Sequence, residues 1–190
     1  SNFQKYLSDE AKAAGVAHAG LQKNQKLDEA IHGQRKPTSK KLRPKDRPLA
    51  NDFITDEQFD RMLDAWFGQV FRVLVPGRSF YIWGGWTNCR NYPAALTRHG
   101  LFWHQQVIWV KHQPVLTRKD MLLDHEWCFY GWKEGAGHTW LGPNNIRDVW
   151  EVSKVPQAHM IHLTEKPVEL ATRAMAYSSR PGEHVLDLFG

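Results

Sequence analysis

The sequence predicts an α/β domain in which helices cover a mostly parallel sheet that includes an antiparallel strand pair. A unit made of a helix, Pro-Gly, a strand and Gly occurs twice, over residues 59–84 and 168–190. Such alternation favours parallel strands that are joined by covering helices. The chain has 190 residues, of which 42% are hydrophobic, so it is large enough for one domain with its own core.

The first of these units begins with a helix. Thr55 and Gln58 match a capping box, and apolar residues then recur at helical spacing from 59 to 74, where a Pro-Gly pair follows. Residues 79–83 are aromatic and β-branched and precede two glycines, which predicts a buried strand that ends in a tight loop. A second helix is predicted over 92–99, because a glycine follows its end.

The middle of the chain predicts a strand pair and an irregular segment. Residues 101–110 and 125–132 are rich in β-branched and aromatic residues, and the two strands can pair antiparallel across the loop between them. Residues 134–158 hold several Gly, Pro and Asn residues. They predict an irregular excursion with only a short strand at 148–152.

The basic charge is confined to the start of the chain. Residues 1–50 hold eleven Lys and Arg against five Asp and Glu, whereas residues 51–190 hold fourteen against fifteen. We expect residues 1–50 to be a basic, partly flexible extension or insertion, and residues 51–190 to be the folded domain. Because prolines interrupt the densest stretch, it is either a solvated loop or an arm that contacts phosphate through Lys40, Lys41 and Arg43.

Composition excludes several other classes of protein. No apolar run approaches the roughly 20 residues of a membrane helix, and the first residues resemble no signal peptide. Two cysteines, Cys89 and Cys128, are too few for a disulfide scaffold, which favours a reducing, intracellular setting. The ten histidines form no metal-ligand spacing, so we expect no metal site.

Two motifs near the end of the chain carry the functional signal. The segment 162–167, His-Leu-Thr-Glu-Lys-Pro, leads into a helix predicted over 168–178, and the segment 187–190, Asp-Leu-Phe-Gly, ends a strand predicted over 184–189. Ligands bind at the carboxyl ends of strands in open α/β sheets, so the second motif would place a carboxylate at the ligand edge. Each motif alone also fits an ordinary helix start or strand end, but their order and distance together are more specific.

These motifs resemble those of the amino-group DNA methyltransferases, which modify adenine N6 or cytosine N4. The chain is similar to permuted, phage-type members, in which the catalytic half precedes the cofactor half. Segments 51–52, 76–83, 107–111 and 125–133 add to the similarity, which covers about residues 51–190. It implies a Rossmann-like, S-adenosyl-methionine-dependent methyltransferase fold, which is incomplete at both ends if the chain is an internal fragment.

The resemblance implies S-adenosyl-methionine as the cofactor. Its sulfonium methyl group would pass to the exocyclic amine of a base that has left the duplex. By the family pattern, the residues that border the cofactor are Thr164, Lys166, Pro167, Asp187, Phe189 and Gly190. Leu163 and Leu188 depart from the family, because proline is usual at both positions.

The resemblance also implies double-stranded DNA as a partner. Lys111, Arg118 and Lys119 follow a predicted strand in a predicted loop, and they either contact phosphate or are simply solvated. The excursion over 134–158 is a candidate target-recognition element. Most of the tryptophans are candidates for the core, whereas Trp140 and Trp150 in the excursion are better candidates for stacking on a base.

One family feature is absent from the sequence. The catalytic tetrapeptide, Asp/Asn/Ser-Pro-Pro-Tyr/Phe/Trp, cannot be placed because no Pro-Pro occurs, so no catalytic residue is assigned. The simplest explanation is an internal fragment with the tetrapeptide upstream of Ser1. The alternatives are a catalytically silent nucleic-acid-binding relative and one subunit of a split enzyme.

The resemblance extends to the setting of the activity. The phage-type similarity favours adenine N6 over cytosine N4 as the target. It also suggests a restriction–modification system in the cytoplasm of a bacterial or phage-infected cell. A homodimer or a partner subunit is the expected assembly if the protein is not a monomer.

Overall fold

The computed structural model describes residues 54–85, 88–115, 120–156, 159–160 and 165–188. The helices and strands discussed below belong to one compact unit, Asp56–Val115 together with Leu123–Gly190. The other unit, Ser1–Thr55 with Leu116–Leu122, lies mostly outside the described residues. The predicted basic extension, with Lys40, Lys41 and Arg43, lies outside the described residues.

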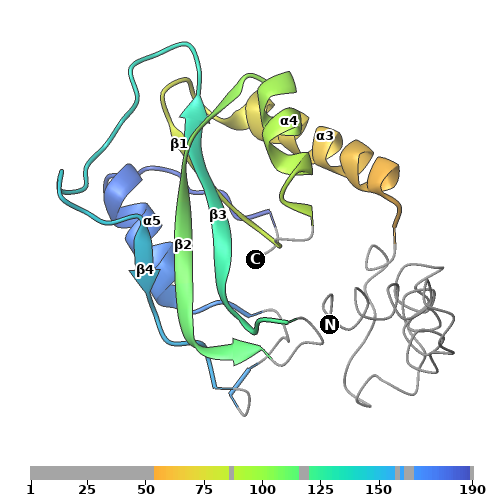
Figure 1. The fold of residues 1–190 in the computed structure, drawn as a ribbon. Helices are drawn as coiled ribbons and strands as arrows, with labels where there is room; N and C mark the ends of the chain where they lie inside the picture. The colour runs from red at the N-terminus through yellow and green to blue at the C-terminus, as the bar shows by residue number, and fades with distance from the viewer. Residues whose placement is uncertain (1–53, 86–87, 116–119, 157–158, 161–164, 189–190) are drawn as a thin grey trace, which may run out of the picture. The chain divides into compact units, whose positions relative to one another are not determined.

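A four-stranded mixed sheet forms the centre of the unit (Figure 1). The strands are β1 (Ser79–Gly84), β2 (Leu101–Val115), β3 (Leu123–Lys133) and β4 (Val149–Glu151), in the order β1-β3-β2-β4. β3 is antiparallel to both β1 and β2, and β2 is parallel to β4. Three of these four strands therefore run in one direction and end at the same edge, as the sequence predicts, and the predicted β2–β3 pair is confirmed.

Helices cover both faces of this sheet. On one face, α3 (Asp56–Val73) and α4 (Asn91–Arg98) pack through a cluster of buried residues, and α5 (Val168–Ser178) packs on the other face (Figure 1). The first cluster consists of Leu63, Phe67, Phe80, Tyr92, Ala95, Leu96, Leu101 and Phe129. The second consists of Val107, Trp109, Cys128, Tyr130, Trp150, Val152 and Leu170. Cys128 in the second cluster has an exposed fraction of 0% and packs there as a small apolar residue.

The three helices lie where the sequence predicts them. α3 starts at Asp56 with two acidic residues in its first turn, which favour the positive end of the helix dipole. α5 has the predicted bounds, and Pro167 is its N-cap residue, directly before the first helical position. Arg98 and His99 at the end of α4 both contact the Asp64 carboxylate of α3, at 3.0 and 3.1 Å, which fixes the pair of helices on their face.

A β-bulge in β2 decides which residues face α5. The register with β3 shifts between Trp103 and Gln105, so His104 is an extra residue in β2. Before the shift, Trp103 packs on Phe129 of the α3–α4 face. After it, Val107 and the alternate residues beyond it belong to the α5 face, because one added residue inverts the alternation of a strand.

The prediction of a strand over 184–189 is wrong for the residues of that range that the structure describes, 184–188. Residues 183–187 have neither helical nor strand structure, and no ladder partner for them occurs among the described residues. The segment is apolar, but Val185 and Leu186 are 60% and 61% exposed. Strand periodicity in a sequence becomes a strand only where a neighbour supplies backbone hydrogen bonds, and here the described sheet has none for it.

Candidate functional site

The first candidate site lies where β2 ends and α5 begins. Glu126 of β3 accepts two lysine contacts: its Oε1 atom is 2.6 Å from Lys111 Nζ of β2, and its Oε2 atom is 3.2 Å from Lys166 Nζ, just before α5. We call these three residues the charged cluster. In open α/β sheets the carboxyl ends of parallel strands form the ligand edge, and the charged cluster stands at that edge.

The charged cluster is partly withdrawn from water. Lys111 is only 7% exposed and lies over the ring of Trp109, with Nζ 5.3 Å from the ring centroid, a distance that suits a cation–π contact. Lys111 therefore belongs to the interior of β2, and the prediction that it lies in a loop is wrong. The strand continues to Val115 where the sequence predicts an end at 110.

Electrostatics keep the carboxylate of the charged cluster ionised. Burial alone would raise the pKa of Glu126, but the Lys166 and Lys111 ammonium groups hold that pKa below its usual value. Two ammonium groups then face one carboxylate, so the charged cluster carries a net positive charge. Such a site ties the start of α5 to the sheet, and its surplus charge favours an anionic group of a ligand.

The end of β1 brings an open loop to the same edge. At Gly84, a Cβ atom would lie 2.9 Å from Tyr92 and 3.0 Å from Phe129, so a side chain does not fit. At Gly85 a Cβ atom would meet nothing within 4 Å. At the predicted loop after the first strand, close packing therefore requires glycine at position 84, whereas Gly85 faces open space.

The residues predicted to border a cofactor are only partly described. Lys166 belongs to the charged cluster, Pro167 caps α5, and Asp187 is exposed in the irregular segment after the helix. Thr164, Phe189 and Gly190 lie outside the described residues, as do Arg118 and Lys119 among the predicted DNA contacts. The structure thus brings Lys166 to the ligand edge and adds Glu126, which the sequence interpretation left without a role.

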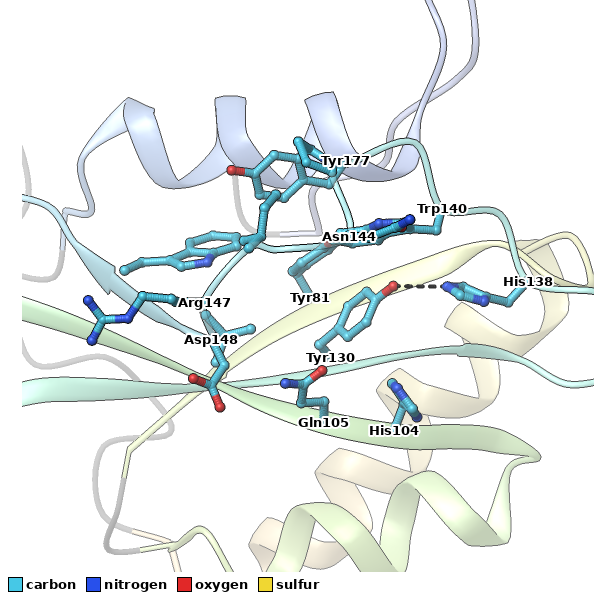
Figure 2. A pocket seen from close by; sticks show the side chains of 14 residues that line it. Tyr81, His104, Gln105, Tyr130, His138, Trp140, Asn144, Arg147, Asp148 and Tyr177 are labelled. Carbon is cyan, nitrogen blue, oxygen red and sulfur yellow. Dashed lines mark hydrogen bonds between the residues drawn. The ribbon is translucent and has the colours of Figure 1, made fainter.

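A second candidate site lies on the α5 face, at the opposite ends of the parallel strands. A cavity of about 280 Å³ opens there between the sheet, α5 and the loop that follows β3 (Figure 2). Aromatic, imidazole and amide side chains line it, with Arg147 and Asp148 beside them. The lining residues labelled in Figure 2 are Tyr81, His104, Gln105, Tyr130, His138, Trp140, Asn144, Arg147, Asp148 and Tyr177.

Hydrogen bonds hold the walls of this cavity in place. The Tyr81 hydroxyl lies 2.9 Å from Ser178 Oγ at the end of α5. The Tyr130 hydroxyl lies 3.3 Å from His138 Nε2, the contact that is dashed in Figure 2. Trp140 lines the cavity and is partly exposed, so it stays available for stacking. Trp150 lines the cavity from the core, where only 3% of it is exposed, and its stacking on a base stays a prediction.

Two features are absent from the described residues. Among them, no helix is long and apolar enough to cross a membrane. The same part of the chain contains no group of three His, Cys, Asp or Glu side chains arranged to hold a metal ion.

An α/β sheet with helices on both faces and a charged ligand edge is the architecture of many cofactor-dependent enzymes. A family model described as DNA methylase, of the N6/N4 methyltransferase type, matches residues 44–190. The chain therefore belongs to this DNA methylase family. This agrees with the resemblance seen in the sequence, while the permuted and phage-type details stay predictions.

Two solved structures agree with the fold, and a third is similar at a lower TM-score. The structure of the M1.HpyAVI–SAM complex matches with a TM-score of 0.56 and 19% identity over 67% of this chain and 64% of that one. A second structure, named M1.HpyAVI alone, matches with a TM-score of 0.53 and 15% identity over 67% of this chain and 61% of that one. TTHA0409 of Thermus thermophilus, provisionally named a DNA modification methylase, matches with a TM-score of 0.47 and 21% identity over 63% and 58%. The chain thus spans less than two thirds of the length of these structures.

Proposed function

We propose that this protein is a DNA methyltransferase that moves a methyl group from S-adenosyl-methionine to an exocyclic base amine. The observation that carries the proposal is the family match over residues 44–190. The charged ligand edge and the likeness in fold to a structure named as a SAM complex support it. Adenine N6 is favoured over cytosine N4 on the sequence resemblance alone.

The proposed roles follow from the chemistry at the ligand edge. A sulfonium cofactor with an amino acid tail has a carboxylate, and the surplus positive charge of the charged cluster would attract it. Glu126 would position Lys166 and the start of α5, because it holds the ammonium group at 3.2 Å. The family pattern adds Asp187, with Thr164, Phe189 and Gly190, to the same pocket.

Calorimetric titration of the full-length protein with S-adenosyl-methionine tests the cofactor. We expect binding by the wild type and at least a tenfold loss of affinity for Asp187→Ala. Glu169→Ala is the matched control, because among the described residues Glu169 pairs with Arg173 on the exposed surface of α5, where ion pairs contribute little. No heat from the folded wild type would remove the cofactor from the proposal.

Methyl transfer itself is measured with labelled S-adenosyl-methionine and double-stranded DNA. Hydrolysis of the DNA to nucleosides, followed by mass spectrometry, distinguishes methylated adenine from methylated cytosine. Transfer by the protein alone would support a complete enzyme. DNA binding without methyl transfer would favour a catalytically silent relative. Methyl transfer only after a partner is added would favour a split enzyme. Both alternatives are tested because the sequence contains no Pro-Pro.

We further propose that residues 1–50 contact DNA phosphates and that residues 134–158 contribute to target recognition. Deletion of residues 33–48, which include Lys40, Lys41 and Arg43, should weaken DNA binding and flatten its dependence on salt, because fewer counterions are then released. An unchanged salt dependence would assign that segment to an ordinary linker.

A further inference from the structure

The cavity on the α5 face is bounded by a closed ring of five aromatic side chains, which we call the aromatic cage. Each ring contacts the next, with centroid distances between 4.8 and 6.2 Å. All five side chains line the cavity. In order around the cage they are Tyr81, Tyr130, Trp140, Tyr177 and Trp150.

The angles between the rings decide what shape of ligand the aromatic cage suits. Neighbouring ring planes are tilted by 35° to 75°. Neighbouring rings therefore meet at an angle and do not form one flat stack. Several tilted faces around one space instead suit a compact group that contacts all of them.

The charges beside the cavity favour a cation. The Asp148 carboxylate belongs to the lining and makes no ion pair or side-chain hydrogen bond with the described residues. The cavity lining contains no lysine, and the guanidinium of its one arginine, Arg147, points away from the aromatic side chains in Figure 2. The negative π faces and the carboxylate therefore act in the same direction.

We propose that the aromatic cage binds a compact organic cation of the alkylated-ammonium type. A cation within about 6 Å of an aromatic centroid is attracted by the ring, and alkylated ammonium groups are bound in this way by cages of several rings. The cavity of about 280 Å³ lies just below the roughly 300–1,000 Å³ of pockets for drug-sized ligands. The ligand group is therefore small, and its site is separate from the charged cluster.

Titration of the full chain with choline tests this proposal, followed by NMR through the indole N–H signals of Trp140 and Trp150, of which the second remains when Trp140 is replaced. The comparison ligand is the uncharged isostere of choline, in which carbon replaces nitrogen. We expect choline to bind about tenfold more tightly, because only the charged ligand gains the cation–π attraction. Equal affinities, or no shift of the signal with choline, would overturn the proposal.

Two variants and one matched control locate the binding. Trp140→Leu removes one wall of the cage and should weaken choline binding about tenfold, and Asp148→Asn should weaken it about threefold. Trp66→Leu is the control, since Trp66 packs against the buried cluster under α3 and α4 on the opposite face of the sheet and should leave binding unchanged. Far-UV circular dichroism checks that each variant is folded. If Trp140→Leu unfolds, Asp148→Asn still tests the proposal, because Asp148 is exposed and its replacement should not disturb the fold.

The remaining outcomes are equally decisive. Full choline affinity in both Trp140→Leu and Asp148→Asn would place the cation elsewhere and overturn the proposal. Tighter binding of adenine than of choline would also overturn it, in favour of base stacking. Neither result would affect S-adenosyl-methionine binding at the charged cluster, so the two proposals fail separately.

Discussion

The two ends of the α5 face are built from the same strands and have opposite chemistry. Towards the carboxyl ends of β1 and β2, Glu126 holds two lysines in the charged cluster. Towards the amino ends, Tyr130, four residues further along the same strand β3, belongs to the aromatic cage. The same strands therefore supply a charged cluster at one end, whereas at the other end the bulge in β2 and the loop after β3 help to enclose a cavity.

This difference predicts unequal responses to mutation. In the charged cluster, each partner is needed because an unpaired buried charge is costly. In the aromatic cage, each contact contributes modestly, and the loss of one leaves the others in place. The comparison can be tested by changing one residue at each end.

The largest effect is expected for Glu126→Leu. It leaves the 7% exposed Lys111 and the nearby Lys166 without their carboxylate, and we expect a loss of about 3 kcal/mol in the free energy of unfolding. Urea unfolding at neutral pH measures it. The double variant Lys111→Met, Glu126→Leu should recover most of the loss; if it does not, the charge imbalance is not the cause.

A smaller effect is expected for Tyr81→Phe in the aromatic cage. This variant keeps the ring but removes the hydroxyl that lies 2.9 Å from Ser178, and should lower the free energy of unfolding by about 1 kcal/mol. Ser178→Ala should give a similar value, and the double variant should add little. Additive losses in a double-mutant cycle would show that the two hydroxyls do not interact.

The smallest effect on the free energy of unfolding is expected from a change in pH. The two ends of the α5 face should respond to it in different pH ranges. Burial and the neighbouring His104 hold the pKa of His138 below its usual value. The unfolded chain therefore takes up this proton first, so stability falls as pH drops below about 6.5. The pKa of Glu126 is also lowered in the folded protein. The stability that Glu126 contributes is therefore complete above about pH 4.3, the ordinary pKa of glutamate, and is lost only as the pH falls through the lower pKa of the folded state.

Unfolding curves between pH 7 and pH 3 measure this separation. His138→Gln should reduce the loss between about pH 6.5 and 5, and should leave the loss below about pH 4.3 intact. Glu126→Gln should do the reverse. If His138→Gln changed only the loss of stability below about pH 4.3, the assignment of the window between about pH 6.5 and 5 to His138 beside the cavity would be wrong.

The sequence predicted the helices better than the strands, for a physical reason. The helix over 168–178 has its predicted bounds because helical hydrogen bonds are local, and apolar spacing and a preceding proline report on them. The strand predicted over 184–189 is absent from the described residues because a strand needs a neighbour, about which periodicity says nothing.

The candidate sites were predicted only in part. Lys166 could be found from its motif, but its partner Glu126 could not, because the contact depends on how β3 lies beside the start of α5. Alternation along β3 does place Glu126, Cys128 and Tyr130 on one face, and that signal could have drawn attention to Glu126. Five aromatic residues from separate segments form the cage, and their meeting could not be predicted from spacing along the chain.

The extra residue in β2 has a consequence for how this domain tolerates change. Opposite it, Gly131 cannot take a side chain, because a Cβ atom there would lie 1.9 Å from the Phe102 carbonyl oxygen. Loss of a single codon at His104 would put Trp109 and Lys111 on the far side of the sheet, and so dismantle the ligand edge without touching any residue in it. We therefore expect this strand to accept substitutions at many positions but no change in length.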